Sequence, residues 1–409
     1  MRKGLLLAAI ALVAMPAGVS AQTALPAPAE VSAALDAHPS VQAAEARTSA
    51  ARAEADALAR GPHEFTFTGS YVNRSVDREG RFDEYDATLS RAIRLPGKAR
   101  LDREIGAAGI VAASNRAEDA RHQAALLLAQ YWWDWLGAAE ESRIDGQAVA
   151  NYARMLAATQ RRVALRDAAR LEADQAEGAL GAARIAAEQS AGREAVARRR
   201  LMAQFPGLPL PDAAPEIPQP DFDEGAIEAL GAKVIARSHE IAAAEAEAQK
   251  AGAAAARAQA ERIADPSIGV RLFSERDGAE RGAGVIFSMP FGNGHRRALA
   301  DRAQAESGAA RAEAAAARAA INEMAATDVV EARFRHAAWL RAREAVAAQV
   351  AALMKLRTGQ AAGEIGLADV LLGERQVHDA FRIEALARAE AQRALTRLRI
   401  DAHELWISE

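Results

Sequence analysis

Apolar and polar residues alternate with a period of two in four short stretches of the chain, which predicts four β-strands. The apolar positions that share a face are Phe65, Phe67 and Tyr71; Ile268, Val270 and Leu272; and Val285, Phe287 and Met289. The strands form two hairpins, 64–94 and 267–290, with charged loops at 76–84 and 275–282. Each strand is about ten residues long, which suits a tilted transmembrane strand, and a small soluble hairpin packed on helices would show the same alternation.

The remaining sequence has the pattern of very long helices. No proline occurs from Gly97 to Phe205 or from Phe291 to Glu409. Apolar residues then recur at coiled-coil spacing, for example Leu128, Trp132 and Trp135 in the first run, and Trp339, Val346, Val350 and Leu353 in the second. The aromatic stretch 131–137 has helical spacing, so we interpret it as packing rather than as a binding patch. Helices of this length are expected to form a coiled coil or bundle.

Each long run contains one interruption. The first lies within 161–174, and the second lies within 356–374, where Gly359, Gly363 and Gly366 follow one another closely. Glycines in a strongly helical stretch predict a helix–turn–helix tip, so each run is expected to fold back as two antiparallel helices.

The order helix, strand, strand, long helical run occurs twice, which indicates an internal duplication. The predicted divisions are a first repeat at 22–205, a proline-rich linker at 206–225 and a second repeat at 226–409. Within the linker, the prolines between 206 and 220 exclude a continuous helix or a central strand. The predicted fold class is mostly α with membrane β: duplicated long coiled-coil helices plus four β-strands per chain.

The first residues predict a secretory signal peptide, 1–21, with basic residues, an apolar core and the small-residue site Val19-Ser20-Ala21. No apolar run of 18 residues follows it, so entry into a membrane would require strands. The net charge of -4 argues against a general nucleic-acid binder, and the absence of cysteine excludes disulfides and thiolate chemistry. Aromatic residues make up only 5% of the chain, which favours closely packed helices.

Catalytic motifs are missing from the sequence, so an enzyme is not expected. The segment 96–98 lacks the glycine spacing of a phosphate loop. The 8 histidines are scattered, and no two lie four residues apart on one helix, so no metal site within a single segment and no cofactor is predicted.

Taken together, the duplication, the strand pairs, the turns at 95–98 and 289–294 and the tip at 363–371 resemble the TolC family of outer-membrane efflux proteins. The resemblance covers essentially the whole mature chain. The segment "LSRAIRLPGKAR" is most similar to the CzcC-like heavy-metal efflux branch, from which it departs at Arg91 and Arg94.

The resemblance implies a homotrimer in the outer membrane of a Gram-negative cell, in contact with its lipid. Three chains would share a 12-stranded β-barrel, and an α-helical barrel would cross the periplasm. The expected partners are a periplasmic adaptor protein and an inner-membrane RND-type pump. The strand-to-helix turns would be Pro96 with Gly97 and Pro290 with Gly292.

Site residues are also implied by the resemblance. Asp369 matches the family's Asp-Val-Leu segment, where an inward carboxylate narrows the periplasmic entrance, so it is the expected pore gate. The alternative is a solvated Asp that favours the helix dipole. Leu372 stands where some members carry a second acidic residue. The adaptor-docking residues would be Gly359, Gly363 and Gly366 of one tip and Arg166 and Asp167 of the other.

The function expected from the sequence is a passive exit duct of a tripartite efflux system, with divalent metal cations as the first candidate cargo. Two alternatives stay open: a duct of the same family for drugs or other organic compounds, and a secreted coiled-coil interaction protein without a pore.

Overall fold

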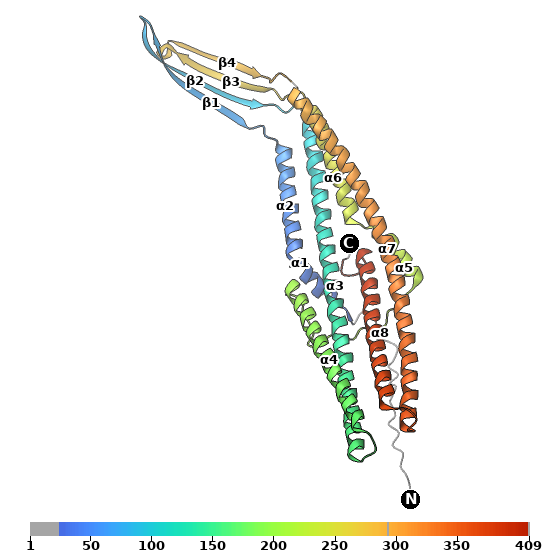
Figure 1. Ribbon diagram of the computed structural model, residues 1–409. Coiled ribbons are helices and arrows are strands. Elements are labelled where there is room, and N and C mark those ends of the chain that lie inside the picture. Colours follow the sequence, from blue (N-terminus) through green and yellow to red (C-terminus); the bar gives the residue numbers. More distant parts are fainter. Residues whose placement is uncertain (1–23, 293, 408–409) are drawn as a thin grey trace. The chain divides into compact units, whose positions relative to one another are not determined.

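The computed structural model describes residues 24–292 and 294–407 (Figure 1). The expected signal peptide, 1–21, lies outside the described residues. The first half of the chain contains α1 (Pro28–Asp36), α2 (Pro39–Arg60), β1 (Phe65–Val76), β2 (Gly80–Ala92), α3 (Lys98–Ala164) and α4 (Arg170–Gln204). The second half contains α5 (Glu224–Ala236), α6 (His239–Ala260), β3 (Ser267–Glu275), the short 3-10 helix η2 (Arg276–Gly278), β4 (Glu280–Ser288), α7 (Gly294–Ala361) and α8 (Leu367–Asp401).

The element order of the first half is repeated in the second half with closely matched lengths. α2 and α6 have 22 residues each, α4 and α8 have 35 each, and α3 and α7 have 67 and 68. This confirms the predicted fold class of duplicated long helices with four strands. The short helices α1 and α5 were not predicted as separate elements. The breaks that follow them have a local cause: Pro39 begins α2, and the Ser238 side chain caps α6 by accepting from the Ile241 N–H.

The four strands form one antiparallel sheet in the order β1-β2-β3-β4 (Figure 1). β2 and β3 join the two hairpins, with Tyr85 opposite Ser274 at one end and Ala92 opposite Ser267 at the other. The hairpin ends turn through residues with positive φ, which are Arg78, Gly80, Arg276, Asp277 and Gly278. β1 and β4 are the edges of this sheet.

The chain forms two compact units, and each contains segments of both sequence halves. Unit 1 comprises 24–33, 128–227 and 331–396, and unit 2 comprises 34–127, 228–330 and 397–407. The long helices α3 and α7 contribute to both units. The repeat boundaries and the 206–225 linker therefore describe the sequence rather than these units, and they stay a prediction.

The core of unit 1 contains the aromatic stretch 131–137. Trp132, Trp133 and Trp135 are buried, and the Trp133 Nε1–H donates to Thr396 Oγ1 of α8 at 3.0 Å. The interpretation of this stretch as packing is confirmed. Near the tips, Leu353 of α7 packs with Val370 and Val377 of α8.

The core of unit 2 is rich in small residues, so its helices approach closely. A Cβ at Gly106 of α3 would lie 2.8 Å from the Cα of Ala55 in α2. Buried alanines, including Ala243, Ala246 and Ala255, give α6 a similarly small inward surface. Within residues 24–292 and 294–407, no helix is both long enough and apolar enough to cross a membrane.

Candidate functional site

The sheet has two chemically different faces. The cross-strand row Phe67, Leu89, Val270 and Val285 is in register from β1 to β4. Ten large apolar side chains share this face, each between 47% and 75% exposed: Phe65, Phe67, Tyr71, Tyr85, Leu89, Ile268, Val270, Leu272, Val285 and Phe287. Soluble monomers rarely expose a contiguous apolar patch of this size, so this face is suited to lipid or to a partner.

The opposite face is mostly polar. It carries Thr66, Thr68, Ser70, Asp86, Thr88, Ser90 and Arg271, with Val72, Phe82, Phe273 and Ile286 among its apolar exceptions. Arg271 of β3 forms an ion pair with Asp86 of β2 across this face. A sheet that is apolar on one side and polar on the other matches the pattern of strands that separate lipid from an aqueous interior.

The predicted turn at Pro96 and Gly97 joins β2 to α3 as a type II β-turn. The Lys98 N–H donates to the Leu95 carbonyl at 3.3 Å, and Gly97 has a φ of 88°. Proline fixes the first central position of such a turn, and the second needs the positive φ that glycine adopts without strain. The sequence "LPGK" therefore ends the strand and begins the helix within four residues.

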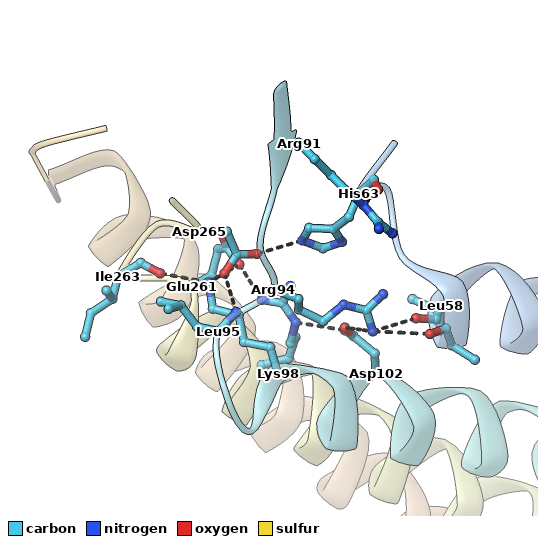
Figure 2. Close-up of polar contacts among 12 residues, drawn as sticks. Leu58, His63, Arg91, Arg94, Leu95, Lys98, Asp102, Glu261, Ile263 and Asp265 are labelled. Atoms are coloured by element: carbon cyan, nitrogen blue, oxygen red, sulfur yellow. Dashed lines mark hydrogen bonds and ion pairs between the residues drawn. The ribbon is translucent and has the colours of Figure 1, made fainter. Parts of the chain in front are cut away.

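Lys98 follows this turn and is almost completely buried, with 1% of its side chain exposed. Its ammonium group donates to Glu261 Oε2 at 3.0 Å, to the Ile263 carbonyl at 2.8 Å and to Asp265 Oδ1 at 2.8 Å. Figure 2 shows these contacts converging on the lysine from the segment between α6 and β3. All three donors of the ammonium group are used, as a buried charge requires.

Asp265 accepts more hydrogen bonds than the one from Lys98. The Leu95 N–H donates to its Oδ1 at 3.0 Å, and its Oδ2 lies 3.1 Å from His63 Nε2. Burial raises the pKa of Asp265, but the hydrogen bonds from Lys98, Leu95 and His63 outweigh burial and lower this pKa to about 2. The carboxylate thus binds both hairpins to the start of α3.

A second set of ion pairs surrounds Asp102 of α3. Arg257 Nε lies 2.8 Å from Asp102 Oδ1, and Arg94 Nη1 lies 3.3 Å from Asp102 Oδ2. Arg94 also donates to the carbonyls of Leu58 and Ala59 at the end of α2 (Figure 2). A cation near the last carbonyls of a helix is favourable, so this position of Arg94 stabilises the end of α2. Arg94 thus connects the end of β2 to α2 and α3.

Arg91 and Arg94 are the two positions at which the sequence departs from the CzcC-like branch. Arg91 Nε donates to the His63 carbonyl at 2.8 Å, and Arg94 contacts Asp102 and α2. This network could not be predicted from the sequence, because Asp265 lies 167 residues from Lys98. Its only local signals were the motif "LPGK" and the dipeptide Asp265-Pro266 just before β3.

The second predicted turn contains Pro290 and Gly292. Gly292 has a φ of 98°, so the positive-φ glycine of the first turn has a counterpart here. Phe291 between them is 90% exposed. Asn293, the next residue, lies outside the described residues, so the assignment of Pro290 and Gly292 as a strand-to-helix turn stays a prediction.

The two predicted tips end their long helices in the same way. After α7, the N–H groups of Gly363 and Glu364 donate to the carbonyls of Gln360 and Gly359. After α3, the N–H groups of Arg166 and Asp167 donate to the carbonyls of Val163 and Arg162. Both are Schellman motifs, which require a left-handed residue after the helix.

The left-handed residue differs between the tips. It is Gly363 in the second tip, with a φ of 79°, and Arg166 in the first, with a φ of 62°. Ile365 packs closely against Gly359: a Cβ at position 359 would lie 2.5 Å from Ile365 Cδ1, so a larger residue there would clash. Gly366 directly precedes α8, and a Cβ there would meet only Asp369, at 3.9 Å.

Asp369 lies in the first turn of α8 and is exposed to solvent. Its counterpart in the first repeat is Glu172, the acidic residue in the first turn of α4. Glu172 lies 3.7 Å from Arg162 Nη1, whereas the residue corresponding to Arg162 in the second repeat is Gly359. The geometry fits both the gate and the helix-dipole interpretation, so the gate role stays a prediction. Leu372, one turn further on, is 54% exposed.

Comparison with known proteins gives a clear answer for the fold. No protein-family model matches the chain, and no curated protein matches it. The crystal structure of the outer membrane protein VceC from Vibrio cholerae superposes with a TM-score of 0.75 at 16% identity, covering 91% of this chain and 95% of VceC. The outer membrane channel CmeC of Campylobacter jejuni gives 0.70 at 14% identity, covering 93% and 86%.

The open state of the outer membrane channel MtrE of Neisseria gonorrhoeae gives a TM-score of 0.67 at 17% identity, covering 93% of this chain and 89% of MtrE. The fold is therefore that of TolC-type outer-membrane channels, as the resemblance implied. At these identities the similarity establishes the fold.

Proposed function

We propose that this chain is the outer-membrane channel of a tripartite efflux system and acts as a passive exit duct. One observation carries the proposal: a four-stranded sheet with an exposed apolar face and a polar opposite face, in a chain with the fold of outer-membrane channels. Lipid would cover the apolar face, and the polar face would line water.

We propose a homotrimer, which the edges of the sheet support. β1 and β4 each have one side with unpaired backbone groups, which cannot face lipid because hydrocarbon offers no hydrogen bonds. If β4 of one chain pairs with β1 of the next, three copies close a twelve-stranded barrel without edges. The hairpin ends would then face the outside of the cell, and the helices would lie in the periplasm.

The helical tips would receive a periplasmic adaptor, which would connect the channel to an inner-membrane RND-type pump. The proposed docking residues are Arg166 and Asp167 in one tip and Gly359, Gly363 and Gly366 in the other. Leu165 and Leu171 beside the first tip are 80% and 65% exposed, so this tip offers apolar surface for contact.

For the cargo we propose divalent metal cations, with drugs or other organic compounds as the alternative. Exposed Asp369 would place one carboxylate per chain at the periplasmic entrance, and rings of carboxylates favour cations. The similarity of "LSRAIRLPGKAR" to the CzcC-like branch also supports metal. Growth of a deletion strain on graded Zn²⁺, Co²⁺ and Cd²⁺, compared with growth on organic toxicants, separates the two.

The alternative class is a secreted coiled-coil interaction protein without a pore. Outer-membrane fractionation separates this class from a channel. The duct predicts that the protein sediments with outer membranes and migrates in detergent gels as a trimer that dissociates on heating. A soluble periplasmic monomer would overturn the proposed function.

A further inference from the structure

Three histidines and three carboxylates gather in unit 2, on segments far apart in the sequence. The histidines are His122 of α3, His239 of α6 and His403 beyond α8; the carboxylates are Asp119 of α3, Glu240 of α6 and Asp401 of α8. The His403 ring lies 5.4 Å from the His122 ring and 4.9 Å from the His239 ring, measured between centroids. None of this was visible along the sequence, because no two of these histidines share a helix.

His122 is the centre of this cluster, and its two ring nitrogens have different surroundings. Nε2 lies 2.8 Å from Asp401 Oδ1, and both side chains are buried, with 2% and 0% exposed. Nδ1 is buried and has no hydrogen-bond partner among the described residues. Its nearest charged neighbour is Glu240 Oε1, at 3.7 Å, which exceeds hydrogen-bond distance.

The hydrogen bond to Asp401 decides what Nδ1 presents. When Nε2 carries the proton and donates to Asp401, Nδ1 is left with a lone pair. Carboxylates that accept from one nitrogen of a histidine in this way are the usual partners of metal-ligating histidines, because they fix the tautomer and the ring orientation. Asp401 is therefore placed as the outer partner of a ligand.

Two carboxylates lie around this nitrogen. Asp119, His122 and Glu240 each offer one ligand atom, and these atoms lie within 4.8 Å of one another. The other oxygen of Glu240 accepts from Ser238 Oγ at 2.8 Å, which holds its carboxylate in place. Two carboxylates this close to each other repel when both are ionised.

We propose that Asp119, His122 and Glu240 bind one divalent transition-metal cation of the zinc class, with His122 Nδ1 as the nitrogen ligand. One imidazole and two carboxylates suit Zn²⁺ or Co²⁺, and the nitrogen ligand disfavours Mg²⁺ and Ca²⁺. The cation would replace carboxylate repulsion by attraction and would join α3 to α6. Through Asp401 it would also hold the end of α8.

This site differs from the proposed cargo path, because its histidine is buried between helices. It does not depend on the proposed function: a chain that conducts nothing would still bind the metal. Conversely, a failure to bind metal would leave the proposed channel function intact, so the two proposals fail separately.

The test uses untagged, chelator-treated full-length protein, titrated with Co²⁺ for its visible absorption and with Zn²⁺ by calorimetry. We expect one cation per chain and no comparable binding of Mg²⁺. Asp119→Asn and Glu240→Gln should each weaken Zn²⁺ binding about tenfold or more. The matched control is Glu118→Gln, which removes the same charge from the neighbouring exposed position and should bind as the wild type does.

Protein folding is controlled within the same experiment. Without metal, Asp119→Asn removes a carboxylate repulsion, so its melting temperature should equal or exceed that of the wild type. Zn²⁺ should raise the melting temperature of the wild type and of Glu118→Gln by the same amount, and that of Asp119→Asn by less. The proposal is overturned if Zn²⁺ does not bind, or if Asp119→Asn and Glu240→Gln bind it as tightly as Glu118→Gln does.

Discussion

Lys98 Nζ donates to Asp265 Oδ1 at 2.8 Å, and this bond joins the first residue of α3 to the segment just before β3. Lys98 follows the first hairpin and Asp265 precedes the second. The pair therefore fixes both hairpins to one helix end, next to the strand-to-helix turn at Pro96 and Gly97.

Replacing Lys98 with Met keeps most of the side-chain volume and removes the charge. Asp265 and the Ile263 carbonyl then lose their buried donor. Breaking a buried ion pair from one side costs about 3–5 kcal/mol, and we expect the lower end because Glu261 is 38% exposed. Thermal unfolding by circular dichroism checks this. Lys355→Met at an exposed position is the control, and equal melting temperatures for the two variants would contradict the account.

The same pair predicts a pH dependence of stability. The folded-state pKa of Asp265 is lowered from 3.8 to about 2, so its stabilising effect is complete above about pH 4. The effect is lost as the pH falls through about 2, where the folded protein takes up the proton. The stability difference between wild type and Asp265→Asn should therefore shrink between pH 4 and pH 2. A difference that stays constant over this range would show that Asp265 is not the titrating group.

The two tips predict opposite effects of exchanging side chains at the left-handed position. Gly363→Val should destabilise the tip by about 1–2 kcal/mol, because a branched side chain disfavours positive φ. Arg166→Gly should stabilise the first tip by up to about 1 kcal/mol for the same reason. Hydrogen exchange of the tip amides measures both.

Adaptor docking is tested with the same glycine. Gly363→Val should reduce efflux while the trimer still reaches the outer membrane. Gly192→Val on α4, outside the proposed docking residues, is the matched control, since a Cβ there meets nothing within 4 Å and no positive φ is involved. Loss of the trimer in Gly363→Val would mean that the glycine is structural, and the docking assignment would fail.

The proposed gate is tested by Asp369→Asn, which keeps the size of the side chain and removes its charge. Single-channel recordings should show lower cation selectivity and weaker block by multivalent cations, with unchanged assembly. Asp379→Asn on the same helix is the control. If the recordings of Asp369→Asn and the wild type agree, Asp369 only favours the dipole of α8.

The hairpin ends should face the outside of the cell. The chain has no cysteine, so a cysteine placed at Asp77 is the only thiol in the protein. The Asp77 side chain is 97% exposed, and an impermeant thiol reagent should label it on whole cells. A cysteine at Asp369 should react only after the outer membrane is opened. Labelling at position 77 that requires lysis would contradict the proposed topology.

The sequence predicted the elements of this fold well, because their signals are local. The period-two alternation found the hairpins, the prolines at 206–220 found a segment without helix or strand, and the glycines near 363 found the second tip. The first tip was predicted at Arg166 and Asp167 from a weaker signal, because Arg166 takes the left-handed position that a glycine usually occupies.

Contacts between distant segments could not be predicted from the sequence. Arg91 and Arg94 were noted only as departures from a pattern, and their partners lie on α2, α3 and the loop before β1. The histidine cluster was missed for a similar reason. Histidine spacing along the sequence indicates only sites within one helix, whereas the proposed ligands come from α3 and α6, and the carboxylate next to His122 is at the end of α8.

The most direct test of the central claim is conductance across a planar lipid bilayer, measured for the wild type and for two neighbouring substitutions on β1. Phe67 lies on the apolar face and Thr68 on the polar face. An arginine on the lipid-facing side of a barrel costs about 2–4 kcal/mol at the bilayer midplane. We predict stepwise conductance for the wild type and for Thr68→Arg, and few or no insertions for Phe67→Arg. Absence of conductance in the wild type, or equal insertion of both variants, would contradict the account.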